Sequence, residues 1–203
     1  VYRYAEPNSS QSNMPDQAAE DAMATLALRY ASESAVLYGL QVEPHDVSWS
    51  RLTPRFTTMI DAIRANNAQS LIFVPGTQYG RYIHYAIDNP IPRTNLVYKT
   101  HPYDSWSSIQ NEYRLDELSA IYPVFLGEFG TGSFSSQSDV DNLMAWADAN
   151  DISWAAWLFN QNGPPTLIKS NQTFEPTAPY GVSVRDNLRA WALSQNGTPA
   201  TVT

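Results

Sequence analysis

The fold is indicated most clearly by residues 122–128, which read Tyr-Pro-Val-Phe-Leu-Gly-Glu. All but the ends of this run are apolar, and its proline lies near the start. That pattern is typical of a strand buried on both faces of a sheet. Short runs of the same kind occupy residues 35–40, 70–74, 95–100 and 152–159. Together the runs predict about five strands of one parallel sheet.

Segments with apolar residues at helical spacing alternate with these strands. The spacing predicts helices after Asn13, which we expect to be an N-cap, from Thr53, over 107–120, over 138–149 and around 184–191. Strand and helix in alternation indicate an α/β fold with helices outside a parallel sheet. An open doubly wound sheet and a TIM-type (β/α) barrel share this order. No glycine-rich phosphate loop follows any strand, which argues against a nucleotide site.

The composition excludes several classes of protein. The 203 residues carry 12 Lys and Arg against 20 Asp and Glu, a formal net charge of -8, so neither nucleic acid nor an anionic membrane is an expected partner. No cysteine is present, which removes disulfides and thiolate chemistry. No run of 18 apolar residues could span a bilayer. With three histidines and no His-Glu-x-x-His motif, we expect neither a metal nor another cofactor.

Polar side chains follow three of the predicted strands. Glu43 comes shortly after the strand at 35–40, His101 and Tyr103 follow the strand at 95–100, and Glu128 follows Gly127. The carboxyl ends of parallel strands carry the active sites of β/α barrels. Two glutamates at such ends suit glycoside hydrolysis, in which one donates a proton and the other attacks the anomeric carbon or activates water. The alternative is that each glutamate only caps a helix or faces solvent.

Aromatic side chains near the same strand ends could pack against sugar rings. The candidates are Trp49, Tyr79, Trp106 and Trp157, and the first three could equally pack within their loops. Trp146 and Trp191 lie at helical spacing, so we expect both in the core.

Five segments in order resemble glycoside hydrolase family 5, the cellulase family. They are Leu-Gln-Val-Glu-Pro-His (40–45), Leu-Ile-Phe-Val-Pro-Gly-Thr-Gln (71–78), Leu-Val-Tyr-Lys-Thr-His-Pro-Tyr (96–103), Val-Phe-Leu-Gly-Glu-Phe-Gly-Thr (124–131) and Trp-Ala-Ala-Trp-Leu-Phe-Asn (154–160). The resemblance implies a retaining, endo-β-1,4-glucanase-like hydrolase. Its substrate would be β-linked glucan or an oligosaccharide of it.

The resemblance also implies a role for each matched residue. Glu43 would be the acid/base and Glu128 the nucleophile. Tyr103 would hydrogen-bond the nucleophile, and His101 would contact the sugar or orient the acid/base. Trp157 would be the stacking platform beside the cleavage point. Tyr79 and Trp106 are the further substrate-binding candidates.

Two departures from the family pattern matter. Val42 stands where the family has an asparagine that binds the sugar 2-hydroxyl, so we expect weak or altered activity. Glu43 also comes early, which implies a truncated barrel lacking its first two to three βα units. Residues 1–193 would form this partial catalytic domain, with 1–4 as the tail of the third strand, and 194–203 a polar tail or linker. Its open sheet edges favour a homo-oligomer or a complementing chain.

These departures leave two other functions open. The chain could be a degenerate barrel that binds glycans without cleaving them. It could also be a glycosidase with another substrate, such as an aryl-glucoside or a different glucan. The acidic composition fits a soluble, secreted or extracellular enzyme that acts on a neutral polymer.

Overall fold

A computed structural model describes residues 13–67 and 69–196 of the chain. The predicted strand remnant at residues 1–4 lies outside the described residues. The chain divides into two compact units, each with its own core. The first comprises Val1–Pro102 and Ile109–Leu126, and the second comprises Tyr103–Ser108 and Gly127–Thr203.

The first unit is built on a parallel sheet. Its strands pair in the order β1 (Tyr38–Gly39), β2 (Ile72–Pro75), β3 (Leu96–Thr100) and β4 (Val124–Leu126). The second unit contains β5 (Ser153–Trp154). A strand therefore stands in each of the five predicted runs, and the predicted α/β class with parallel pairing is confirmed. The first and last strands are shorter than their apolar runs.

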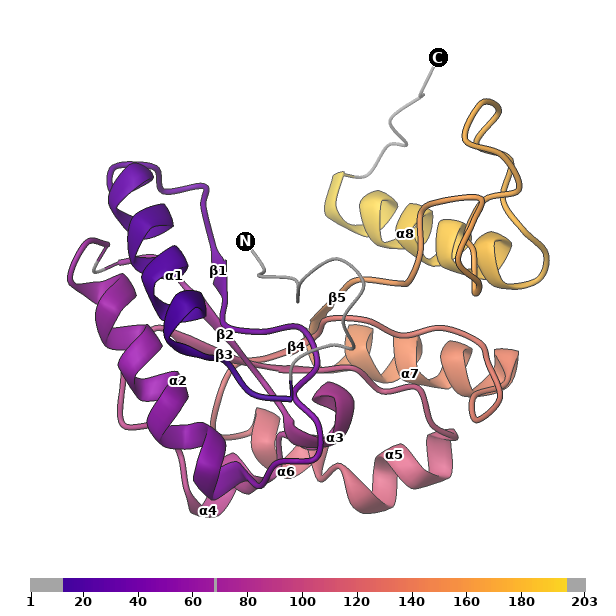
Figure 1. Ribbon diagram of the computed structural model, residues 1–203. Helices are drawn as coiled ribbons and strands as arrows, with labels where there is room; N and C mark the ends of the chain where they lie inside the picture. The colour runs from indigo at the N-terminus through magenta and orange to yellow at the C-terminus, as the bar shows by residue number, and fades with distance from the viewer. Residues whose placement is uncertain (1–12, 68, 197–203) are drawn as a thin grey trace. The chain divides into compact units, whose positions relative to one another are not determined.

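Two long helices cover one face of this sheet. Figure 1 shows α1 (Gln17–Arg29) and α2 (Trp49–Arg64) side by side, next to β1, β2 and β3. Trp49 of α2 lies 6.3 Å from Tyr98 of β3, measured between ring centroids. One stripe of α2 is fully buried and consists of Leu52, Phe56, Met59, Ile60 and Ile63. This stripe forms part of the core of the first unit.

The starts of both helices differ from the prediction. Asp16, not Asn13, caps α1, because its carboxylate accepts a hydrogen bond from the Ala19 amide at 2.8 Å. The second helix begins four residues before Thr53, so that Pro54 lies inside it. Trp49 is buried, and its packing outweighs the hydrogen bond that the proline cannot donate.

The predicted helix over 107–120 is wrong as a single element. The segment forms α5 (Trp106–Glu112) and α6 (Leu115–Ser119), separated by Arg114 in the left-handed region with φ 49°. Two further short helices, α3 (Thr77–Gly80) and α4 (Tyr85–Asp88), follow β2.

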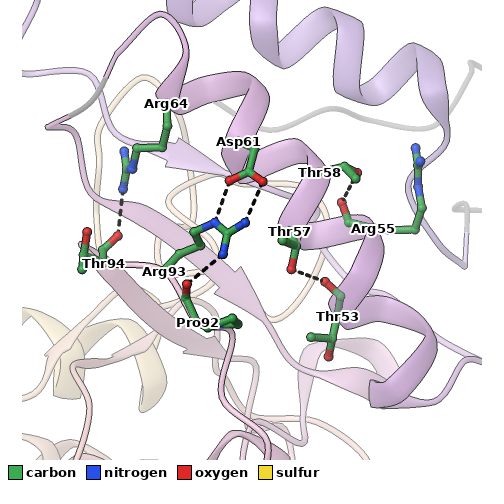
Figure 2. A network of polar contacts seen from close by, with 9 residues as sticks. All are labelled: Thr53, Arg55, Thr57, Thr58, Asp61, Arg64, Pro92, Arg93 and Thr94. Atoms are coloured by element: carbon green, nitrogen blue, oxygen red, sulfur yellow. Dashed lines mark hydrogen bonds and ion pairs between the residues drawn. The ribbon is translucent and has the colours of Figure 1, made fainter.

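A polar network fastens α2 to the chain that leads into β3 (Figure 2). Arg93 donates hydrogen bonds of 2.6 and 2.8 Å to the two carboxylate oxygens of Asp61. These hydrogen bonds hold the pKa of Asp61 below its ordinary value. Arg64 donates to the carbonyl of Thr94 at 3.1 Å. The network thus positions the start of β3, the strand that leads to His101.

The register of the sheet decides which side chains face away from α2. Lys99 is level with Pro75 on one side and Phe125 on the other, so the three share a face. The rings of Phe73 and Phe125 lie 5.1 Å apart on this face. We call it the inner face, and it carries Gly39, Phe73, Pro75, Val97, Lys99 and Phe125. It continues toward Glu43 and His101 beyond the strand ends.

The second unit contains the last two long helices. They are α7 (Gln137–Ala149), which begins at a capping box of Ser136 and Asp139, and α8 (Tyr180–Asn196). The latter continues past residue 193, where a polar tail was expected. Trp191 is 58% exposed, so its predicted place in the core is wrong. Among the described helices, none combines the length and apolarity that crossing a membrane requires.

Candidate active site

Glu43 and His101 form the centre of the candidate site in the first unit. The chain after β1 carries Glu43, and His101 directly follows β3. The distance between His101 Nδ1 and Glu43 Oε1 is 2.9 Å. The His101 side chain is 1% exposed, whereas that of Glu43 is 23% exposed. One side of the carboxyl group is therefore held by a buried imidazole, and the other can reach a substrate.

The protonation state of His101 follows from its burial. Loss of hydration lowers the pKa of His101, the hydrogen bond to Glu43 opposes this effect, and the charge of Lys99 adds to it. His101 is therefore neutral at neutral pH. A neutral imidazole can donate to a carboxylate or accept from a carboxylic acid, depending on its tautomer. The contact can thus persist while Glu43 gains or loses a proton, as an acid/base requires.

Gly80 supplies the space and backbone partner of His101. Its carbonyl accepts a hydrogen bond from the His101 amide at 3.1 Å. Its φ of +76° lies in the left-handed region, and a Cβ there would stand 3.3 Å from Cγ of His101. A side chain at this position would strain the backbone and press on the imidazole.

Tyr79 is fixed next to the segment that carries Glu43. Its amide donates to the carbonyl of Pro44 at 2.8 Å, and its ring stacks on His45 at 4.7 Å between centroids. Gln78 and Tyr79 both have positive φ, which is uncommon for residues other than glycine and often marks functional loops. Tyr79 is 48% exposed, as a residue that stacks on a sugar would be.

A cavity of about 780 Å³ borders this loop and the start of α2. Its lining includes Asp46, Ser50, Gln78 and Tyr85. Trp49 also borders the cavity, but it is 5% exposed and its indole donates to the carbonyl of Asn89 at 2.8 Å. For Trp49 the structure therefore favours packing over sugar stacking.

Glu128 and Trp157 lie in the second unit. The hydroxyl group of Tyr180 contacts backbone carbonyls close to both residues. Glu128 is half-buried and precedes the buried Phe129, whose carbonyl accepts the Trp157 amide at 2.9 Å. The Tyr180 hydroxyl lies 2.8 Å from the Phe129 carbonyl and 2.6 Å from that of Trp157. Burial raises the pKa of Tyr180, so it remains a donor. Sequence reasoning missed Tyr180, because only its long-range contacts show its role.

Tyr103 and Trp106 also belong to the second unit. Tyr103 is half-buried, and its contact with the nucleophile stays a prediction. The Trp106 amide donates to Asp139 at 2.8 Å, and its ring lies 6.5 Å from that of Trp146 in α7. Trp106 is thus anchored on α7, and its part in sugar binding also stays a prediction.

Within each unit taken alone, the described residues do not bring three His, Asp or Glu ligand atoms close enough to hold one ion. Glu43 and His101 make a pair, which suits proton transfer.

Replacing Tyr180 by Phe should weaken hydrolysis through the loop that carries Glu128. The Phe129 carbonyl keeps its hydrogen bond from the Trp157 amide, but the Trp157 carbonyl loses the hydroxyl as a donor, which costs about 1–3 kcal/mol of stability. We expect a lower kcat with little change in the circular dichroism spectrum at 25 °C. Thermal unfolding and kcat on a soluble β-glucan measure both effects. Tyr30, the residue at the C-terminal end of α1, lies outside the lining of the cavity beside α2 and offers a Tyr→Phe control; equal behaviour of the two variants would contradict the role given to Tyr180.

The fold and the two groups of side chains, one around Glu43 and the other around Glu128, define the class of protein to which this chain belongs. A parallel sheet with helices outside, and with Glu, His and aromatic residues just after its strands, is the arrangement of β/α-barrel enzymes. The family model for cellulase, glycosyl hydrolase family 5, matches residues 2–163. The chain belongs to glycosyl hydrolase family 5.

Curated relatives and solved structures agree with this membership. Endoglucanase A of Evansella cellulosilytica is 27% identical over 193 residues, which is 87% of this chain and 40% of the relative. Endoglucanase Z of Dickeya dadantii is 26% identical over 188 residues, 88% of this chain and 43% of the relative. The chain thus spans about two-fifths of the length of these relatives.

The solved structures show the fold. The β-glucanase SdGluc5_26A of Saccharophagus degradans, in complex with cellotetraose, superposes with a TM-score of 0.76 at 18% identity, covering 86% of this chain and 60% of that one. The catalytic domain of Thermobifida fusca endoglucanase Cel5A, also with cellotetraose, gives 0.72 at 22% identity, covering 84% and 63%. These matches confirm the predicted TIM-type (β/α) fold, and the chain covers less than two thirds of each of the two solved chains.

Proposed function

We propose that this chain carries the catalytic groups of a retaining, endo-β-1,4-glucanase-like hydrolase. The observation that carries the proposal is the Glu43–His101 pair. A half-exposed carboxyl group held by a neutral, buried imidazole can act as a proton donor and acceptor at a cleavage point. Family membership adds the expectation that a second glutamate, Glu128, acts as the nucleophile.

The reaction would proceed in two displacements. In the first, the Glu128 carboxylate attacks the anomeric carbon while Glu43 gives its proton to the departing glycosidic oxygen. The bond from carbon to the leaving sugar breaks as the ester bond to Glu128 forms. In the second, Glu43 removes a proton from water, whose oxygen attacks the same carbon and releases Glu128. Each group returns to its starting state.

A β-linked glucan is the proposed substrate. Tyr79, Trp157 and Trp106 offer aromatic faces, and two structural neighbours were solved with cellotetraose. A glucan polymer is too large to enter a cell, so the proposal implies an exported enzyme. Val42 cannot hydrogen-bond a sugar hydroxyl, and a missing donor of this kind costs about 10²–10³ in rate. We therefore propose a slow enzyme, rather than one that only binds glycans.

The stereochemistry of the product tests the mechanism. Proton NMR of cellotetraose hydrolysis should show the β anomer first, with the α anomer appearing later by mutarotation. Initial release of the α anomer would contradict a retaining mechanism. Binding of cellotetraose without any release of reducing ends, at high protein concentration, would instead favour the glycan-binding alternative.

A further inference from the structure

The chain between β5 and α8 exposes two aromatic rings side by side. Phe159 is 66% exposed and Phe174 is 57% exposed, although their ring centroids lie 5.9 Å apart with an angle of 11° between the ring planes. Single exposed apolar side chains are common on protein surfaces, whereas adjoining ones more often mark a binding surface. We call these two residues the phenylalanine pair. Figure 1 shows the chain that carries the pair as a projecting loop.

Backbone hydrogen bonds close this loop, which comprises residues 158–177. The Leu167 amide donates to the Leu158 carbonyl at 2.9 Å, and the Phe174 amide donates to the Ser170 carbonyl at 2.9 Å. Phe174 has a φ of 54°, a left-handed conformation that is rare for a bulky side chain and that is typical of functional loops. The contact between the rings is therefore not what closes the loop.

The base of the loop packs against the segment that carries Glu128. A Cβ at Gly130, two residues after Glu128, would lie 2.6 Å from Cγ of Pro165 and 3.2 Å from the carbonyl oxygen of Trp157. Only glycine permits so close an approach. Phe159 follows Trp157 by two residues, which is at most about 7 Å along the backbone. The phenylalanine pair thus adjoins the predicted stacking platform and, through the base of the loop, the predicted nucleophile.

Two side-chain amide groups next to Phe159 can donate to a ligand. Asn160 Oδ1 accepts from the Asn162 amide at 3.1 Å, and Gln161 Oε1 accepts from the Asn171 amide at 2.8 Å. Because a backbone amide can only donate, these two bonds fix which end of each side-chain amide is the oxygen. The nitrogen atoms, Nδ2 of Asn160 and Nε2 of Gln161, donate to no other residue that the structure describes.

The composition of the loop suits a neutral ligand that is rich in hydroxyl groups. Residues 159–166 and 170–174 include no charged side chain, and the exposed Lys169 is paired with Glu175. Aromatic faces pack against the C–H face of a sugar ring, and amide groups hydrogen-bond its hydroxyls. An anionic or cationic ligand would find no unpaired opposite charge on these two segments.

We propose that the phenylalanine pair is a further sugar-binding site. A β-glucan chain that extends past Trp157 packs on the two rings, and Asn160 and Gln161 donate to its hydroxyl groups. The inference rests on the proposed function, which makes β-glucan the substrate. It gives the pair a role in holding the polymer and no role in breaking the glycosidic bond.

Replacing each ring by leucine tests this site. Phe159→Leu and Phe174→Leu keep an apolar side chain but remove the flat face, so each should weaken binding of a soluble β-glucan about three- to tenfold, the usual worth of one aromatic contact. Tyrosine at either position keeps the face and should bind like the parent. Affinity electrophoresis in gels containing hydroxyethyl cellulose measures binding, in a Glu128→Gln background that prevents hydrolysis. Trp191→Leu is the matched control, because Trp191 is a similarly exposed aromatic residue on α8, outside the loop.

The effect on hydrolysis should depend on the length of the substrate. With Glu128 intact, the leucine variants should raise the KM for the polymer and leave kcat nearly unchanged. They should hydrolyse the short dinitrophenyl cellobioside like the parent, because the pair holds sugars away from the cleavage point.

Gln161→Glu is a second variant that leaves both rings in place. Its carboxylate can still accept from the Asn171 amide, but the free donor is lost, so binding of hydroxyethyl cellulose should weaken. Thermal unfolding checks that each variant folds. Leucine variants that bind like the parent would overturn the proposal, and so would tyrosine variants as weak as the leucine variants. If leucine changes only the oligomeric state, seen by size-exclusion chromatography, the pair is a protein contact and the proposal is wrong.

The outcomes separate this inference from the function on which it rests. Weaker binding by the leucine variants of a protein that shows no hydrolysis would retain the sugar site and refute the enzyme. Hydrolysis of the polymer with an unchanged KM in the leucine variants would retain the enzyme and refute the sugar site.

Discussion

Glu128→Gln should lower the rate of β-glucan hydrolysis by at least about 10³-fold, as the loss of a reacting group commonly does. The amide has the size of the carboxyl group but carries no negative charge with which to attack the anomeric carbon. The half-buried Glu128 lies next to Phe129, whose carbonyl accepts hydrogen bonds from Trp157 and Tyr180. Because these contacts involve the backbone, the substitution leaves them in place. The loop should therefore keep its structure while the rate falls.

Reducing-end release from a soluble β-glucan measures this effect, and the melting temperature checks the fold. The exposed Glu175 provides a control, since Glu175→Gln makes the same chemical change elsewhere in the second unit. Unlike the control, Glu128→Gln should also fail to form a covalent adduct with a fluorinated glucoside, as followed by mass spectrometry. A Glu128→Gln variant that hydrolyses glucan at the rate of the control would refute the assignment of the nucleophile.

Glu43→Gln should lose activity in a way that depends on the leaving group. A general acid contributes about 10²–10⁴-fold when the departing oxygen needs a proton. Cello-oligosaccharides have such poor leaving groups, whereas a dinitrophenyl cellobioside releases a stable anion unaided. The variant should thus be strongly impaired on the first substrate. On the second it should still form the glycosyl–enzyme ester and show a burst of phenolate.

A small nucleophile tests the other half of the role of Glu43. Without a general base, water attacks the ester slowly, but azide needs no deprotonation. Added azide should restore turnover of the dinitrophenyl substrate and yield the β-glycosyl azide. Glu33→Gln is a suitable control, since Glu33 is exposed in the first unit. Equal losses on both substrates, with no response to azide, would argue that Glu43 is structural.

The sheet could be predicted from the sequence because the strand segments are apolar at nearly every position. Residues 70–74 and 95–100 are examples, and a strand of this kind is stable only where both faces of its sheet are buried against other parts of the protein. The approach of His101 to Glu43 also follows from sequence, because parallel strands end at one edge. That two residues 58 positions apart meet at 2.9 Å confirms this part of the reasoning.

Other features depend on contacts that no local pattern encodes. The break at Arg114 lies within residues 106–120, which contain neither proline nor glycine, so no local breaker signals it. Tyr180 acts through two carbonyls that lie 51 and 23 residues away. Lys99 is polar within an apolar strand, and the strand pattern alone does not say which face it occupies.

The contrast between the two lysines has a practical consequence for chemical handling of the protein. Amine-reactive reagents attack accessible side chains, so Lys169 should react while the buried Lys99 is protected. Coupling through lysine would then attach the chain to a bead or a dye at a single side-chain position. That position lies outside the sheet, so the attachment would leave Glu43 and His101 chemically untouched.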